Sequence, residues 1–292
     1  MSERILLAGC GDLGRRAAER LLARGDEVFA LRRQPPDDGN EGIRWVRGDL
    51  GRPGGLAGLP QGVTRLVYLP TPDARDEAAY RRIFVDGLRH LLDVLDGSAL
   101  RRVLFVSSSA VYGEHGGDWV DEDTSVAPPG FNGRVLFEAE QWLLQQAAAM
   151  QVSPVVLRLA GLYGPGRLQL IERLRAGLAK APREVPHWAN RIHVDDAAAA
   201  IVHLLDLPDV QPLYLGVDDT PLPLDVLYDH LSGLLGVAPV AAGPAPAGVG
   251  SKRLSNARLR ASGFAPQWPD ARVGYAALLG CIAVCPPLGG AP

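Results

Sequence analysis

The sequence predicts an α/β fold in which a parallel sheet carries helices on both of its faces. Short apolar runs alternate with segments of helical spacing over about the first 160 residues. The first apolar run, 4–8, leads directly into a glycine-rich turn and then into a helix. Strands that alternate with helices favour parallel pairing and right-handed crossovers, and together these give a doubly wound sheet. Hydrophobic residues make up 47% of the chain, which is enough for a sizeable core.

The apolar runs place the strands of this sheet at 4–8, 27–31, 43–46, 65–69, 102–106, 152–159 and 213–217. The first helix follows the glycine-rich turn, with Ala17, Leu21 and Leu22 on one face and Gly25 at its end. Further helices are predicted at 73–96, 138–150, 168–178, 195–205, 224–235, 256–262 and 271–279, and a loop at 237–250. We expect residues 1–165, joined by about 190–218, to form the main domain. The segments 166–189 and 219–284 then form a smaller substrate lobe, and 285–292 a tail.

Composition excludes several classes of protein. The 30 basic and 33 acidic side chains leave a net charge of −3, which favours neither nucleic acid nor an anionic membrane as a partner. No apolar run approaches the ~20 residues that cross a bilayer. Cys10, Cys281 and Cys285 are too few for a disulfide scaffold and lack the second pair of ligands that a zinc site needs. We therefore expect free thiols, no metal and a cytoplasmic location.

Gly9, Gly11 and Gly14 have the spacing of a dinucleotide-binding turn between a strand and a helix. In such a turn the first glycine permits the bend and the second lets the backbone approach a pyrophosphate. The third lets the helix pack against the strand. Backbone N–H groups, here including those of Asp12 and Leu13, then face the phosphates together with the positive end of the helix dipole. The sequence therefore predicts a Rossmann-like domain that binds a dinucleotide.

The end of the second strand indicates which dinucleotide is bound. NAD-binding folds of this type place an acidic residue there to hold the ribose 2′-hydroxyl, but this chain has Arg32 and Arg33. A guanidinium group suits a 2′-phosphate, because it can donate two parallel hydrogen bonds. The expectation is therefore NADP, with NAD as the alternative; a solvated basic loop is the structural alternative for the two arginines.

Two other strand ends complete the predicted cofactor site. Asp49 and Leu50 follow the third strand and are assigned to adenine, the carboxylate at its amino group and the leucine on its face. Leu69 and Pro70 end the fourth strand, beside the glycine-rich turn, and are assigned to the same cofactor.

Three downstream segments carry a resemblance to a known family. They are Val-Ser-Ser-Ser-Ala-Val-Tyr-Gly at 106–113, Arg-Leu-Ala-Gly-Leu-Tyr-Gly-Pro-Gly at 158–166 and Asn-Arg-Ile-His-Val-Asp-Asp at 190–196. With the glycine-rich turn, they resemble the extended branch of the short-chain dehydrogenase/reductase superfamily, the NAD-dependent epimerase/dehydratase family. The resemblance runs from residue 4 to about residue 280. It implies a small-molecule substrate and a homodimer formed through two helices of the main domain.

The resemblance also implies four catalytic positions, which this chain keeps only in part. Family members place a serine or threonine at the end of the fifth strand, and that position falls on Ser108. Their asparagine falls on Phe84, and their tyrosine and lysine fall on Asn132 and Leu136. No tyrosine precedes a lysine by four residues anywhere in the chain. The usual acid/base pair is therefore absent.

The catalytic candidates that remain are Ser108, Ser109, Tyr112 and Arg134. Ser108, with Ser109 beside it, is expected to polarise a substrate oxygen. Tyr112 follows the fifth strand, whose carboxyl end is where ligands bind in open α/β sheets. Arg134 begins the helix on which the family carries its active-site residues and is expected to anchor an anionic substrate. The structural alternatives are a surface loop for Tyr112 and a solvated helix end for Arg134.

Other polar residues have a weaker claim to function. Glu114 and His115 follow Tyr112 and are candidates to replace the missing acid/base pair. Tyr163 is interpreted first as a packing residue, and Asp195 first as a helix N-cap.

Two functions stay open at this point. The first is an NADP-dependent reductase, epimerase or dehydratase that acts on a small hydroxylated or keto substrate. The second is a non-catalytic NADP-binding protein that senses the cofactor or regulates a partner.

Overall fold

The computed structural model describes residues 2–36 and 42–281. A seven-stranded sheet in the order β12-β7-β5-β4-β1-β2-β3 runs through the larger part of the molecule, and every neighbouring pair is parallel. The predicted fold class and all seven strands are confirmed. Ile5 to Ala8 are fully buried, which places the first strand in the middle of the core. The strands are β1 (Arg4–Ala8), β2 (Glu27–Arg32), β3 (Ile43–Arg47), β4 (Arg65–Tyr68), β5 (Arg102–Ser108), β7 (Ser153–Leu159) and β12 (Leu213–Gly216).

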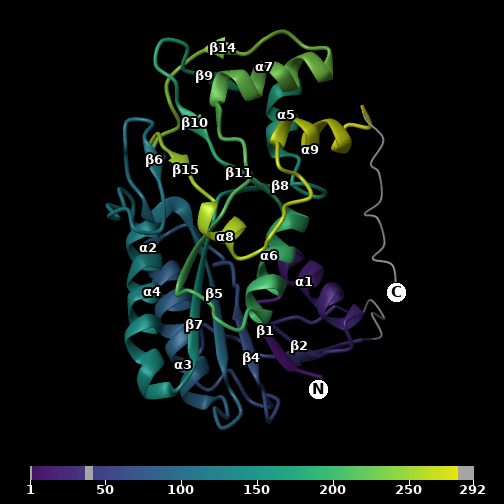
Figure 1. Ribbon diagram of the computed structural model, residues 1–292, viewed down its shortest axis with the longest axis vertical. Helices are drawn as coiled ribbons and strands as arrows, with labels where there is room; N and C mark the ends of the chain where they lie inside the picture. The colour runs from purple at the N-terminus through teal and green to yellow at the C-terminus, as the bar shows by residue number, and fades with distance from the viewer. Residues whose placement is uncertain (1, 37–41, 282–292) are drawn as a thin grey trace.

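Helices cover the two faces of this sheet (Figure 1). On one face α1 (Asp12–Ala23) packs against α6 (Val194–Asp206). The other face carries α2 (Glu77–Tyr80), η1 (Arg81–Asp86), α3 (Gly87–Val94) and α4 (Phe131–Met150). This is the two-sided covering that a sheet of buried parallel strands requires.

A smaller lobe lies beyond the carboxyl ends of the strands, at the top of Figure 1. Its own apolar core joins α5 (Gln169–Arg175), α7 (Leu224–Leu235) and α9 (Ala271–Leu278). The division of the chain into domains stays a prediction, and its tail at 285–292 lies outside the described residues. The remaining short elements are η2 (Ser109–Val111), α8 (Ala257–Ala261), β6 (Trp119–Val120), β8 (Gly161–Tyr163), β9 (Lys180–Ala181), β10 (Trp188–Ala189), β11 (Arg191–His193), β13 (Leu222–Pro223), β14 (Ala241–Ala242) and β15 (Arg253–Leu254).

The prediction of a single helix over 73–96 is wrong in two respects: where the helix begins, and that it is α-helical throughout. It begins after Asp76, whose carboxylate caps the helix by accepting from the N–H of Ala79 at 2.8 Å. In the middle, η1 is a π-helix, because the hydroxyl of Tyr68 donates to the carbonyl of Ile83. The N–H of Gly87 bonds to the carbonyl of Arg82 instead, five residues back. A side chain from β4 thus decides the register of this helix.

Three other expectations differ from the structure. Helix α4 begins at Phe131 rather than at 138, because Gly130 provides an N-cap without any side-chain hydrogen bond and so leaves no sequence signal. The predicted loop at 237–250 contains the short strand β14, which pairs with β9. The N-cap of α6 is His193, not Asp195: the His193 ring accepts from the Asp195 N–H at 3.2 Å.

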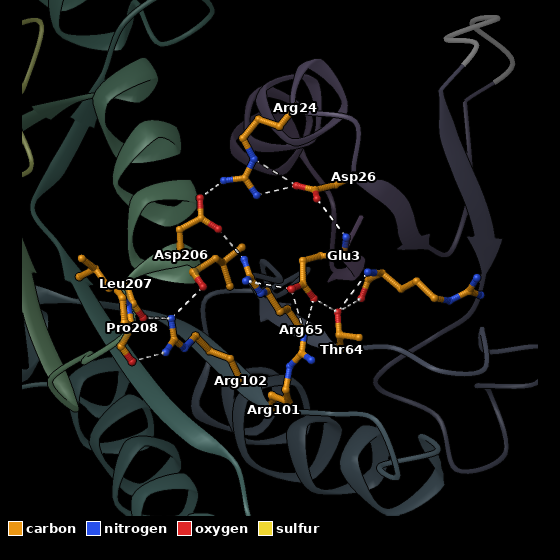
Figure 2. Close-up of polar contacts among 12 residues, drawn as sticks. Glu3, Arg24, Asp26, Thr64, Arg65, Arg101, Arg102, Asp206, Leu207 and Pro208 are labelled. Carbon is orange, nitrogen blue, oxygen red and sulfur yellow. Dashed lines mark hydrogen bonds and ion pairs between the residues drawn. The ribbon is translucent and has the colours of Figure 1, made fainter. Parts of the chain in front are cut away.

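At the amino-terminal edge of the sheet, arginines join the sheet to α1 and α6 (Figure 2). The carboxylate of Asp206 pairs with Arg24 and with Arg65, and Glu3 pairs with Arg65 at 3.2 Å. Arg102 on β5 donates to carbonyls that the end of α6 leaves unpaired, those of Leu204, Leu205 and Leu207. These contacts fix this edge and leave the opposite edge, under the lobe, for a ligand.

A buried ion pair connects β7 to α4. Arg158 and Glu140 pair at 2.6 Å, and their side chains are only 4% and 1% exposed. The hydroxyl of Ser107 on β5 donates to the same carboxylate. Arg158 also donates to the hydroxyl of Tyr112 at 2.7 Å, and that hydroxyl donates to the carbonyl of Asp121 at 2.8 Å. Every charge in this network has a partner, which burial at this depth demands.

A second buried carboxyl lies where the lobe meets the sheet. Asp218 follows β12 and is 2% exposed, and its Oδ2 has no hydrogen-bond partner among the described residues. Desolvation raises the pKa of this carboxyl to about 8. Asp218 is therefore protonated over most of the neutral range, which avoids a buried unpaired charge.

The variant Glu140→Gln should unfold more easily than the wild type. Without the carboxylate, Arg158 keeps its charge in the core with no ionic partner, which costs about 3–5 kcal/mol. Urea denaturation measures the difference in the free energy of unfolding. The matched control is Glu138→Gln, on the same helix, because Glu138 pairs with Arg81 with side-chain exposures of 38% and 43%. That exposed pair should contribute below ~1 kcal/mol. Equal effects of the two variants would contradict this account.

The variant Asp218→Asn should change how stability depends on pH. The folded chain holds the Asp218 proton up to about pH 8, whereas the unfolded chain releases it near pH 4. The wild type therefore loses stability from this group as pH rises between these values. The asparagine variant has no such loss, so its advantage over the wild type should grow by ~1.4 kcal/mol or more between pH 5 and pH 8. Denaturant titrations at several pH values check this, and a pH-independent difference would exclude it.

Candidate cofactor and substrate site

Two adjoining cavities lie at the carboxyl ends of the central strands. The first has a volume of about 660 Å³ and spans the ends of β1, β2 and β3. The second has a volume of about 410 Å³ and reaches from α1 to β5, α4 and β7. Both are lined by Gly11, Pro70, Thr71 and Pro72, so together they form one elongated site. This is the edge at which open parallel sheets bind their ligands.

The glycine-rich turn forms the floor between the two cavities. Gly9 has a φ of +88°, and a Cβ there would lie 2.4 Å from the Cα of Pro70. Only glycine fits a backbone position that is both left-handed and in contact with a neighbouring main chain. At Gly11 a Cβ would meet no atom within 4 Å, so this glycine leaves open space above the start of α1. The turn thus exposes its backbone to the cavity, as an approaching pyrophosphate requires.

Charged side chains surround the start of α1. The Asp12 carboxylate accepts from Arg16 at 3.0 Å and lies 3.3 Å from Nε of Arg167. Leu13 is 9% exposed and lines the second cavity with Asp12 and Gly14. Arg167 belongs to the segment between β8 and α5, so this ion pair connects that segment to the amino-terminal end of α1.

Two arginines line the first cavity at the end of β2, and they differ in whether their side chains have a partner. The side chain of Arg32 makes no hydrogen bond or ion pair with any residue in 2–36 or 42–281, which leaves its guanidinium available to a ligand. Arg33 instead donates two hydrogen bonds to the carboxylate of Asp73. Asp49 lines the same cavity and accepts from the N–H of Gly51 at 2.9 Å, and Leu50 lies beside it with 7% exposure.

The second cavity is lined by both apolar and polar residues. Leu69 lines it, and so do the residues at the four positions that the resemblance assigns to catalysis: Phe84, Ser108, Asn132 and Leu136. The Ser108 hydroxyl accepts from the N–H of Ala110 at 3.2 Å, where it caps η2. Its own proton can therefore be donated to a ligand oxygen. Neither lysine of the chain reaches this cavity: Lys180 lies on β9, and Lys252 is 4% exposed and donates to the carbonyl of Gly250.

Three predicted catalytic residues are not brought to either cavity. Tyr112 is 1% exposed inside the Arg158 network, and desolvation raises the pKa of its phenol to about 12. Ser109 begins η2 and does not line either cavity. Arg134 lies on the exposed side of α4, with Glu77 3.7 Å away. Their catalytic role stays a prediction without geometric support.

The polar residues near the lobe also have structural partners. Glu114 accepts from the N–H of Ser251 at 2.8 Å, which lowers the pKa of its carboxyl and joins two loops. Tyr163 is 1% exposed and stacks on Tyr275, with ring centroids 4.4 Å apart. Desolvation lowers the pKa of His193 to about 4, so this ring stays neutral while it caps α6. Asp195 pairs with Arg16 at 2.6 Å. These residues therefore have structural roles, because their contacts pack the smaller lobe and hold its loops against the main domain.

Among the residues that line the second cavity, sequence reasoning missed three with hydrogen-bonding side chains, namely Thr71, Tyr80 and Arg167. Tyr80 lies one helical turn before Phe84, and its ring meets the ring of Phe131 edge-on at 5.3 Å. Its position one turn from Phe84 was the only available signal. Its hydroxyl forms no hydrogen bond with another residue of the described chain, which leaves it available to a ligand.

Some chemistries receive no support from the described residues. In 2–36 and 42–281, no group of three or more His, Cys, Asp or Glu side chains could hold a metal ion. Cys10 lines the first cavity but is fully buried, and desolvation raises the pKa of its thiol to about 12, which disfavours the reactive thiolate. Among the helices of that same part of the chain, none has the length and apolar character needed to cross a membrane.

Known proteins share both the sequence and the fold. Residues 5–214 match the family model of the NAD dependent epimerase/dehydratase family. Protein YeeZ of Escherichia coli is 30% identical over 247 residues, which are 81% of this chain and 85% of YeeZ. An epimerase/dehydratase-like structure from Methylobacillus flagellatus is 39% identical with a TM-score of 0.80, covering 96% of this chain and 99% of that one.

A more distant structure shares the fold alone. It is DesIV, a dTDP-glucose 4,6-dehydratase from Streptomyces venezuelae solved with NAD bound, which is 21% identical with a TM-score of 0.79. The alignment covers 95% of this chain and 96% of DesIV. The family match spans most of the chain, and the sheet order and the glycine-rich turn agree with it. The chain belongs to the NAD-dependent epimerase/dehydratase family.

Proposed function

We propose that this protein binds a nicotinamide dinucleotide along the two joined cavities and prefers NADP to NAD. One observation carries the proposal: the cavity that begins at Gly9 and Gly11 ends at Arg32, an arginine with no ionic partner among the described residues. Backbone N–H groups and the dipole of α1 suit the pyrophosphate. The free guanidinium suits a 2′-phosphate, and no carboxylate stands at the end of β2 to hold a 2′-hydroxyl.

We further propose that the bound substrate is a small hydroxylated or keto compound resembling a sugar. A bound nicotinamide supplies hydride transfer to or from such a substrate. Ser108 donates a hydrogen bond to the substrate oxygen, and Tyr80 is the one tyrosine of the described chain that lines the same cavity. Arg167 is the cation there, paired with Asp12. DesIV, which shares the fold, acts on a nucleotide sugar and supports this substrate class.

A specific observation favours a second candidate function. At the positions where the family carries its acid/base pair, this chain places the amide of Asn132 and the apolar side chain of Leu136. Positioned acid/base catalysis contributes roughly 10²–10⁴ in rate. A cavity that binds the cofactor without that pair fits a sensor of NADP or a regulatory protein, in which the bound state itself is the signal.

Titration calorimetry with NADPH and NADH tests the cofactor proposal. NADPH should bind about ten- to a hundredfold more tightly than NADH, because one charge-assisted contact contributes ~1.5–3 kcal/mol. The double variant Arg32→Ala/Arg33→Ala should lose this preference while its affinity for NADH changes little. Arg173→Ala, an exposed arginine on α5, is the matched control.

A preference for NADH would overturn the assignment of the arginines to a 2′-phosphate. If neither nucleotide binds, the cofactor proposal fails. Once binding is established, a screen of keto and hydroxy compounds for a change in NADPH absorbance separates the two candidate functions. Turnover supports the enzyme, and its loss in Tyr80→Phe would support Tyr80 as the proton donor.

A further inference from the structure

An ion pair crosses the first cavity. Both terminal nitrogens of Arg33 donate to the two carboxylate oxygens of Asp73, and both residues line the cavity wall. Arg33 follows β2 and Asp73 follows the end of β4, 40 residues further along the chain. Because β1 lies between β2 and β4 in the sheet, the pair bridges the two loops that flank the glycine-rich turn. It lies within the site where we place the cofactor.

The ion pair is well formed but open to exchange. The side chains of Arg33 and Asp73 are 55% and 53% exposed, so water solvates both charges when they separate. Exposed ion pairs of this kind contribute little to stability. The hydrogen bonds from Arg33 lower the pKa of Asp73, which keeps this carboxylate ionised at neutral pH. An anion of higher charge could therefore replace Asp73 as the partner of Arg33.

Of the charged groups around Arg33, Asp73 is the one in direct contact with its guanidinium. Arg82 acts on Asp73 from η1 through a longer-range attraction. Asp49 acts on Arg33 in the same long-range manner, while its own carboxylate is held by the N–H of Gly51. Only Asp73 makes hydrogen bonds to Arg33 among the described residues.

We propose that Asp73 determines cofactor specificity by competing with the 2′-phosphate for Arg33. With NADH bound, Arg33 keeps Asp73 as its partner, and Arg32 remains an unpaired cation at this end of the site. With NADPH bound, the phosphate takes Arg33, and the Asp73 carboxylate stands beside a dianion that repels it. The preference for NADPH is then the attraction of Arg32 and Arg33 reduced by the presence of Asp73. This inference rests on the proposed binding of NADP.

The variant Asp73→Asn, which keeps the shape of the side chain and removes its charge, tests the proposal. Calorimetry should show NADPH binding about five- to thirtyfold more tightly than to the wild type, the gain from one freed charge-assisted contact. The affinity for NADH should change less than about twofold, because NADH brings no phosphate to Arg33. Asp209→Asn, an exposed carboxylate outside both cavities, makes the same change in net charge and should leave both affinities unchanged.

A double variant shows whether Asp73 acts through Arg33. In the background of Arg33→Ala, the further change Asp73→Asn should improve NADPH binding less than it does in the wild type, because it then relieves only the repulsion between Asp73 and the phosphate and frees no arginine. Thermal melting of each variant confirms that the fold is kept. An unchanged affinity for NADPH in Asp73→Asn, or an equal gain for NADH, would overturn the role of Asp73 while leaving the proposed function intact. If the wild type binds neither nucleotide, the proposed function fails, and this inference fails with it.

Discussion

The arrangement of this molecule depends on one ion pair in its core. Arg158 on β7 pairs with Glu140 on α4. Ser107 donates to the same carboxylate, and the hydroxyl of Tyr112 accepts from Arg158. A buried charge is tolerated only with a partner in good geometry, so the pair fixes how α4 lies against β5 and β7. That placement brings the first turns of α4, with Asn132 and Leu136, to the second cavity. It also explains why Tyr112 is a structural residue here, because its hydroxyl belongs to this network.

The glycine-rich turn constrains the other half of the site in a different way. Its floor is backbone against backbone, since Gly9 leaves no room for a side chain beside Pro70. No side-chain chemistry is involved in this contact, yet it sets the distance between the ends of β1 and β4. The polar groups that a ligand meets there are main-chain N–H groups and the dipole of α1, which recognise phosphates without depending on the identity of the side chains.

The two cavities differ in the polar groups that they offer to a ligand. The first carries charged groups, Arg32, Arg33, Asp49 and Asp73, and it suits the nucleotide end of a cofactor. The second combines apolar side chains with the ion pair of Asp12 and Arg167 and with uncharged polar side chains: Thr71, Tyr80, Ser107, Ser108 and Asn132. The first cavity is where we propose that a dinucleotide binds, and the positions that the resemblance assigns to proton transfer carry Asn132 and Leu136.

The sequence by itself determined the positions of the strands, their parallel pairing in one sheet and the glycine-rich turn. It could do so because a buried parallel strand must be apolar and because only glycine fits the backbone at position 9. The absence of a Tyr–Lys pair also follows from counting residues alone. Tertiary structure decided the rest. The π-helix depends on a hydroxyl from β4, the partner of Arg33 is Asp73 on another loop, and Tyr80 reaches the second cavity from a facing helix. These are contacts between residues far apart in the chain, and no local pattern of residues records them.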